Sequence, residues 1–204
     1  MDSNIGMSEK KKFHFGISFN SPVILTFTFI CLGALILGKV TNEWTTTHIF
    51  SVYKSSFADP LTYVRFFGHI FGHAGWEHFL GNIMYILVVG PLLEEKYGSS
   101  DIAVVIGVTA VITGLIHMFF FPNTMLLGAS GVVFAFILLS SITSIKEGKI
   151  PMTFILVAVV YLGQQVYDGI FVNDNVSNLT HIIGGITGAA LGFFMNKSVK
   201  DKNV

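Results

Sequence analysis

Charged residues are scarce in this chain of 204 residues. Lys, Arg, Asp and Glu make up 12% of it, whereas a soluble globular domain carries about 25%. Hydrophobic residues make up 52% of the chain, and the mean hydropathy is +0.68. A surface with so little charge would be too apolar to keep a soluble domain dispersed. We therefore predict an integral membrane protein of one domain.

The chain also has no excess of basic residues and only one cysteine. Twelve Lys and Arg residues balance twelve Asp and Glu residues, so there is no basic excess and we expect no nucleic-acid partner. Cys31 is the single cysteine and cannot form an internal disulfide. It lies in an apolar run, so it says nothing about the redox compartment.

What the chain does have is a series of apolar segments. The first is about long enough to cross a bilayer, near the typical length of roughly 20 residues. Residues 1–20 are polar and contain three consecutive lysines, which is not the pattern of a cleaved secretory signal, so we expect the first segment to remain as an anchor. The pattern predicts an all-α, polytopic protein with six transmembrane helices. The segments are 22–40, 79–93, 102–121, 125–145, 151–170 and 181–196.

The lysines predict how these helices are oriented. An even number of spans puts both termini on one side, and cytoplasmic loops collect positive charge. We predict a multi-pass protein of the cell membrane with a cytoplasmic N-terminal segment (1–21), a membrane domain (22–196) and a cytoplasmic C-terminal tail (197–204). The lysines on the cytoplasmic side are Lys10, Lys11, Lys12, Lys96, Lys146, Lys149, Lys197, Lys200 and Lys202.

The connection between the first two spans, residues 41–78, is long and rich in aromatic side chains. Long connections are usually functional or interfacial, and aromatic side chains favour the level of the lipid headgroups. We expect this loop to lie partly embedded in the outer leaflet. Its aromatic residues are Phe50, Tyr53, Phe57, Tyr63, Phe66, Phe67, Phe71 and Trp76.

A few strongly polar side chains fall within or beside the spans, where such groups are functional candidates by default. Asn82 follows His78 by four residues, so the two share a helix face. Ser130 lies near the outer end of the fourth span and His181 opens the sixth. His117 lies deep in the third span, and we interpret it as structural.

Segment length suggests the depth of the serine and the histidine. The strongly apolar stretches 125–139 and 181–195 hold 15 residues each, about 22 Å of helix against a hydrocarbon core of about 30 Å. If their inner ends meet the cytoplasmic face, Ser130 and His181 lie below the outer surface, in a depression that water can enter.

Small residues would let the two helices approach closely. Gly184, Gly188 and Gly192 recur every four residues, and Gly131 and Ala135 form a matching pair after Ser130. Small residues at this spacing allow close packing of membrane helices, so we expect the serine and the histidine to meet.

A serine in contact with a histidine can act as a nucleophile with its general base. His78, Asn82 and the backbone N–H of Ser130 could then donate hydrogen bonds to a developing oxyanion. Together these groups describe an acyl-transfer site.

In these residues the chain resembles the rhomboid family of intramembrane serine proteases. The resemblance covers roughly residues 60–196 and implies the same six-helix fold. The matching motifs are "HAGWEHFLGN" (73–82), "LEEKYG" (93–98), "GASG" (128–131) and "HIIGGITG" (181–188).

The resemblance also implies roles for single residues. Ser130 and His181 match the catalytic pair, His78 and Asn82 the side chains that bind the oxyanion, and Gly128 the glycine in the turn before the nucleophile.

Three more residues of this chain match family positions that we interpret as structural. Two other residues depart from the family pattern. Arg65, His73 and Glu94 are the structural matches. Val64 stands where a tryptophan is common, and Phe134 where a tyrosine commonly supports the histidine ring. Phenylalanine keeps the stacking face, so we expect altered rather than abolished activity.

We predict a serine endopeptidase that needs no cofactor or metal and cleaves transmembrane protein substrates within the lipid bilayer. A catalytically silent protein that uses this scaffold to bind transmembrane helices is the main alternative. A metal site built on His69, His73 and His78 lacks a carboxylate or cysteine to complete a tetrahedral set. A transporter is a third alternative, weakened by the lack of an evident internal repeat.

Overall fold

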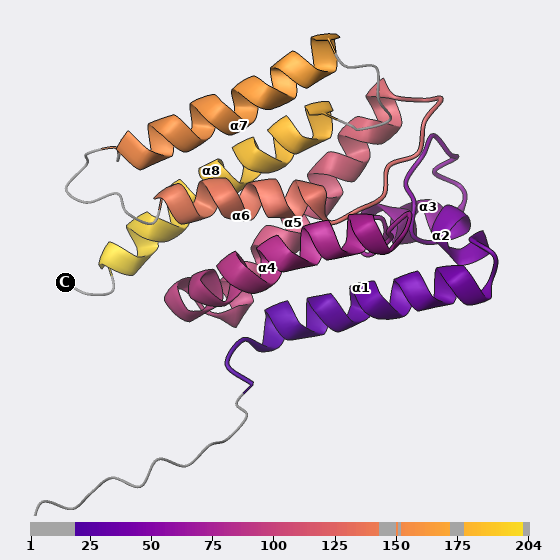
Figure 1. Cartoon of the computed structure of the whole chain (residues 1–204), viewed down its shortest axis with the longest axis horizontal. Coiled ribbons are helices and arrows are strands. Elements are labelled where there is room, and N and C mark those ends of the chain that lie inside the picture. Colours follow the sequence, from indigo (N-terminus) through magenta and orange to yellow (C-terminus); the bar gives the residue numbers. More distant parts are fainter. Residues whose placement is uncertain (1–18, 143–149, 151, 172–177, 202–204) are drawn as a thin grey trace, which may run out of the picture.

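The computed structural model describes residues 19–142, 150, 152–171 and 178–201. Within these ranges the chain is all-helical and forms no extended sheet, as the composition predicts. Figure 1 shows the long helices side by side, with the two shortest at one end of the bundle. The helices are α1 (Pro22–Val40), α2 (Trp44–His48), α3 (Pro60–Gly68), α4 (Trp76–Tyr97), α5 (Ser99–Phe120), α6 (Ser130–Ile142), α7 (Met152–Phe171) and α8 (Asn178–Asp201).

Each of the six predicted apolar segments overlaps one helix of 13 residues or more, although several of the predicted boundaries differ from the observed ones by three to five residues. The fourth segment was expected to start at residue 125, whereas α6 begins at Ser130. The residues before it form a loop because Gly128 adopts a φ of +124°, which ends any continuous helix there.

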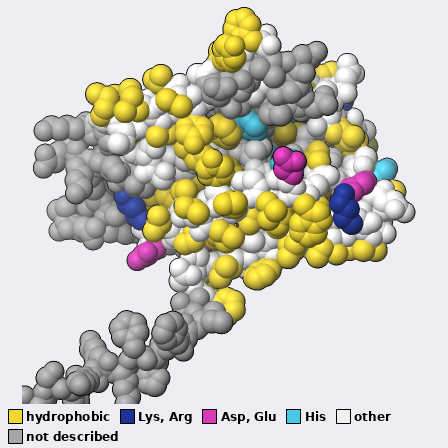
Figure 2. All heavy atoms as spheres, viewed as in Figure 1, with side chains coloured by type: hydrophobic (Ala, Val, Ile, Leu, Met, Phe, Trp, Pro, Cys, Tyr) yellow, Lys and Arg dark blue, Asp and Glu magenta, His cyan; other side chains and the backbone are white. Residues whose placement is uncertain are grey.

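The described helices form a multi-pass membrane bundle. Four of them, α1, α4, α5 and the Asn178–Met195 part of α8, are long and apolar enough to cross a bilayer by themselves. The described part of α6, Ser130–Ile142, has 13 residues, about 20 Å of helix. Figure 2 shows hydrophobic side chains over much of one face of the molecule, as expected for a surface that meets lipid.

A buried glutamate joins the beginnings of α1 and α5 to the end of α4. The Glu94 carboxylate accepts hydrogen bonds from the backbone N–H groups of Val23 and Ile24, both at 3.0 Å, and from Ser99 Oγ at 2.7 Å. Glu94 therefore caps α1, whose first N–H groups have no partner inside the helix. The side chain is 4% exposed.

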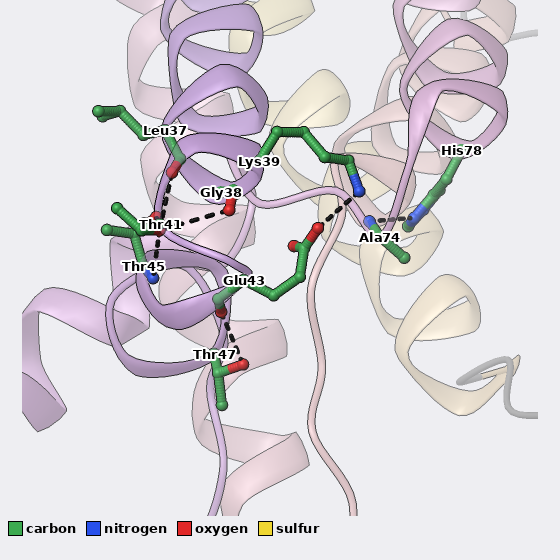
Figure 3. A network of polar contacts seen from close by, with 9 residues as sticks. All are labelled: Leu37, Gly38, Lys39, Thr41, Glu43, Thr45, Thr47, Ala74 and His78. Carbon is green, nitrogen blue, oxygen red and sulfur yellow. Dashed lines mark hydrogen bonds and ion pairs between the residues drawn. The ribbon is translucent and has the colours of Figure 1, made fainter.

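A tight turn connects α1 to α2 (Figure 3). Asn42 and Glu43 adopt positive φ angles of 49° and 64°. The Thr41 hydroxyl donates to the Leu37 carbonyl at 2.7 Å, and Lys39 pairs with Glu43 across the turn. These contacts reverse the chain at the end of the first long helix.

The connection that follows is ordered by a buried arginine. Arg65 Nε donates to the His48 carbonyl at 2.8 Å, an Arg65 terminal nitrogen donates to Asp59 at 3.0 Å, and the guanidinium lies 4.6 Å from the Tyr53 ring centre. The hydrogen bond from the Leu61 N–H, together with Arg65, lowers the pKa of Asp59. Arg65 thus has the structural position that the sequence predicts.

Several predictions fall outside the described residues. The N-terminal segment 1–21 is described only from residue 19, and the loops 143–149 and 172–177 are not described. Most of the lysines that predict the orientation also lie outside the described part. The cytoplasmic position of both termini, the embedding of the first loop and the domain boundaries therefore stay predictions.

Candidate active site

The turn before α6 presents Ser130 at the first position of the helix. Gly128 donates its backbone N–H to the His69 carbonyl at 2.9 Å, and Leu126 pairs with Val52 through two hydrogen bonds of 2.9 Å. These bonds tie the turn to the loop between α1 and α4. The first N–H groups of a helix have no intrahelical partner, and the helix N-terminus carries partial positive charge. The backbone around Ser130 therefore favours an anion.

The structure brings Ser130 and His181 into direct contact. His181 Nε2 lies 2.8 Å from Ser130 Oγ, which is hydrogen-bonding distance for a hydroxyl and an imidazole nitrogen. The two residues are 51 positions apart in the sequence, and both side chains are partly exposed. A base within reach of a nucleophile that a substrate can approach is what acyl transfer requires.

Close packing of α6 and α8 makes this contact possible. A Cβ atom added to Gly184 would collide with the Gly131 carbonyl oxygen, and one added to Gly188 would collide with the Ala135 carbonyl oxygen. The backbones of the two helices thus touch without intervening side chains, as the spacing of small residues predicts. We call this contact the α6–α8 seam.

An aromatic ring orients the histidine. The ring of Phe134, one turn after Ser130 in α6, stacks on the ring of His181 with centroids 4.6 Å apart and planes 9° apart. The stacked face holds the plane of the imidazole while its Nε2 points at the serine. Phe134 therefore retains the supporting contact that the sequence analysis expects.

His78 and Asn82 lie beside the turn that carries the serine. They share one face of α4, as predicted. A Cβ atom on Gly128 would lie 2.7 Å from His78 Nε2 and 3.7 Å from Asn82 Nδ2, so both side-chain nitrogens approach the same glycine. This crowding explains why a residue without a side chain precedes the serine by two positions.

Both side chains can donate hydrogen bonds into this space. Asn82 Nδ2 is buried and has no hydrogen-bond partner within the described residues. His78 Nδ1 accepts from the Ala74 N–H at 3.5 Å (Figure 3), so in the neutral ring the proton lies on Nε2, the atom that faces Gly128. Two N–H groups thus converge near the turn.

Two further histidines, His69 and His73, are buried. Both residues lie in the connection between α3, which ends at Gly68, and α4, which begins at Trp76. His69 Nε2 lies 3.0 Å from the Ala110 carbonyl of α5, and burial lowers its pKa to about 4. His73 is held by the Phe71 carbonyl at 3.1 Å, and burial lowers its pKa to about 4 as well.

Neither the metal hypothesis nor a catalytic role for His117 gains support. Among the described residues, no group of three His, Cys, Asp or Glu side chains is placed to hold a metal ion. His117 is 2% exposed and stacks on Phe121 with centroids 5.2 Å apart. Its surroundings match the predicted structural role.

One residue near the site was missed by the sequence analysis. Tyr161 of α7 contacts the Phe134 ring edge-on, with centroids 5.8 Å apart and planes 84° apart. The sequence pattern of 151–170 predicts only an apolar span, and the spacing of its residues does not distinguish this tyrosine from the others in the segment. Only the packing of α7 against α6 reveals it.

These features define a class of protein: a helical membrane bundle with a serine and a histidine paired between two closely packed helices. The family model described as the Rhomboid domain matches residues 60–198, more than half of the chain. The chain belongs to the rhomboid family.

Three similar proteins also carry rhomboid names. The chain is 30% identical over 149 residues to "Rhomboid-related protein 1" of Caenorhabditis elegans, covering 69% of this chain and 42% of that protein. It is 30% identical over 155 residues to "Rhomboid-related protein 2" of Mus musculus, covering 66% and 51%. It is 26% identical over 178 residues to "Rhomboid protease GlpG" of Yersinia pestis, covering 85% and 62%. The chain thus spans about half the length of these relatives.

Proposed function

We propose that this chain is an intramembrane serine endopeptidase that cleaves a peptide bond in or near a transmembrane segment of another protein. The observation that carries the proposal is the 2.8 Å contact between His181 Nε2 and Ser130 Oγ. The name of one relative, "Rhomboid protease GlpG", supports the same activity. The Ser130–His181 pair lies between helices of a membrane bundle, so we propose membrane proteins as its substrates.

The reaction begins with attack of Ser130 Oγ on the carbonyl carbon of the scissile bond. His181 Nε2 accepts the hydroxyl proton as the new C–O bond forms, and the carbonyl oxygen takes up the negative charge. His181 then gives this proton to the leaving amine nitrogen as the C–N bond breaks, which leaves an acyl-enzyme. A water molecule then attacks the acyl carbon while His181 takes its proton; the ester bond to Ser130 Oγ breaks, His181 returns the proton to Oγ, and the carboxylic acid product leaves.

The oxyanion is stabilised by donors that already face the turn. These are His78 Nε2–H, Asn82 Nδ2–H and the backbone N–H of Ser130. Donors fixed before the reaction need no reorganisation as charge develops, which is the main advantage of such sites. The unpartnered, buried Asn82 amide suits this role, since its hydrogen bond would form only in the transition state.

The mechanism uses no metal or cofactor, because each proton transfer is assigned to His181 and each charge to an N–H donor. Activity should therefore be indifferent to strong chelators. We infer in addition that the protein lies in the cell membrane with both termini in the cytoplasm, as its lysine distribution favours.

The proposal is tested with purified protein and a panel of single-span substrates, comparing wild type with Ser130→Ala. Wild type should cleave at least one substrate, and an activated fluorophosphonate should label Ser130. Failure of both reactions in protein that still binds the substrates would instead indicate the silent, helix-binding alternative. Substantial turnover by Ser130→Ala would end the serine-protease hypothesis.

A further inference from the structure

Three aromatic rings form a continuous contact from α7 to the serine. Figure 1 shows α7 lying beside α8, and α7 packs against both α6 and α8. From α7, Tyr161 contacts Phe134 edge-on at 5.8 Å, and Phe134 stacks on His181 at 4.6 Å. His181 in turn lies 2.8 Å from Ser130. Each ring thus touches the next one on a different helix, from Tyr161 on α7 through Phe134 on α6 to His181 on α8.

The edge contact has a physical consequence for the histidine. A phenylalanine ring can turn about two side-chain torsions, and the second of these is broad. A stacked face orients the imidazole only while the phenylalanine itself is held. Because the planes of Tyr161 and Phe134 are 84° apart, the tyrosine edge blocks rotation of the Phe134 ring away from His181.

We propose that Tyr161 is a positioning residue: its ring holds Phe134 against His181. The inference rests on the proposed function, since it concerns the general base of that reaction. It also assigns α7 a role in the chemistry, because a displacement of α7 would release the support of His181.

The experiment separates the tyrosine ring from its hydroxyl. Tyr161→Leu removes both, whereas Tyr161→Phe removes only the hydroxyl. Tyr167→Leu and Tyr167→Phe are matched controls on the same helix, because Tyr167 is 56% exposed and contacts Phe171 instead. Each variant is measured for its rate of labelling by a fluorophosphonate, for kcat and KM on a single-span substrate, and for Tm.

We expect Tyr161→Leu to lower both the labelling rate and kcat by roughly 2- to 12-fold, the value of one edge-to-face aromatic contact. KM should change little, because the substitution alters the orientation of His181 rather than the binding of the substrate. Tyr161→Phe should recover most of the loss.

Several outcomes would overturn the inference while leaving the proposed function intact. These are labelling of folded Tyr161→Leu at the wild-type rate, a fall in Tm with unchanged rates, an equal loss in Tyr167→Leu, or no recovery in Tyr161→Phe. The proposed function fails separately, if wild-type protein is not labelled or if Ser130→Ala is labelled and cleaves as well as wild type.

Discussion

The junction of α1, α4 and α5 is held by hydrogen bonds to a buried carboxylate, whereas the junction of α6 and α8 is held by direct backbone contact. At the first, three donors converge on Glu94. At the second, Gly184 and Gly188 leave no room for even a methyl group against Gly131 and Ala135. The two junctions therefore restrain the bundle in different ways.

The two junctions fix different features of the bundle: one holds helix ends together, and the other sets the separation of two helix axes. Hydrogen bonds to a carboxylate hold helix ends together, but they weaken gradually as distances change. A backbone contact sets the separation of two helix axes directly, because nothing between them can adjust. The α6–α8 seam thus determines the distance between Ser130 and His181. Glu94 lies 12 residues after Asn82 along α4, about 18 Å away, so we expect it to affect stability rather than chemistry.

The largest effect should come from the dyad itself. We expect Ser130→Ala and His181→Ala each to abolish cleavage while Tm in detergent stays near the wild-type value. The double variant should be no worse than the worse single variant, because residues that act as one unit give non-additive losses. Cleavage of a single-span substrate measures the effect, and residual turnover that falls further in the double variant would contradict it.

The seam is tested by adding one methyl group. Gly184→Ala should push α8 away from the Gly131 backbone and lower kcat by about 100-fold, since a displacement of about 1 Å can cost that much. The control is Gly33→Ala in α1, where an added Cβ has nothing within 4 Å. If both variants keep wild-type kcat, the seam does not set the distance between the dyad residues.

A smaller effect is expected at the proposed oxyanion donor. Asn82→Ala should lower kcat by about 10- to 100-fold, at or below the low end for loss of one donor, because His78 and the Ser130 backbone still donate. KM and Tm should change little, since the bond strengthens only in the transition state. A sharp fall in Tm with full activity of the folded fraction would instead make Asn82 a packing residue.

The sequence predicted the features that depend on local spacing. Hydropathy located the six long helices, and the interval of four residues placed His78 and Asn82 on one face. The small residues of the α6–α8 seam were recognisable for the same reason, because a helix repeats its faces every three to four residues. These patterns are properties of single helices and need no knowledge of what packs against them.

The features that were wrong or missed depend on contacts between distant segments. The start of α6 is set by the positive φ of Gly128 and by its bond to the His69 carbonyl, neither of which hydropathy reveals. The contact of Tyr161 with Phe134 joins two apolar helices whose sequences give no register relative to each other. Such pairings follow from tertiary packing rather than from propensity.

Loss of the buried carboxylate should reduce stability alone. In Glu94→Gln an amide N–H₂ replaces one oxygen and faces donors at Val23, Ile24 or Ser99, so at least one buried hydrogen bond is lost at about 1–3 kcal/mol. Thermal unfolding in detergent should show a lower Tm, while kcat per folded molecule is unchanged. Glu95→Gln, the exposed neighbour, is the control. A matching loss of kcat would mean that this junction also positions the dyad.

The last prediction concerns pH and stability rather than activity, and it tests the histidine that links the first loop to the turn before Ser130. Burial lowers the pKa of His69 from 6.5 to about 4. Between these two pH values the unfolded chain therefore binds a proton at His69 that the folded chain does not bind. Below pH 6.5 each unit of acidification should therefore remove up to about 1.4 kcal/mol of stability, and the loss should end near pH 4.

The variant His69→Gln isolates this contribution. Its side-chain amide can still donate to the Ala110 carbonyl but does not titrate. Wild-type Tm should fall more steeply than that of the variant as the pH decreases from 6.5 to 4, whereas above pH 7 the two curves should run parallel, because His69 is neutral in both the folded and the unfolded chain there. Equal slopes at acidic pH would mean that His69 is accessible to protons in the folded protein. The loop would then open without unfolding the bundle, and its hold on the turn before Ser130 would be looser than the Gly128 to His69 hydrogen bond indicates.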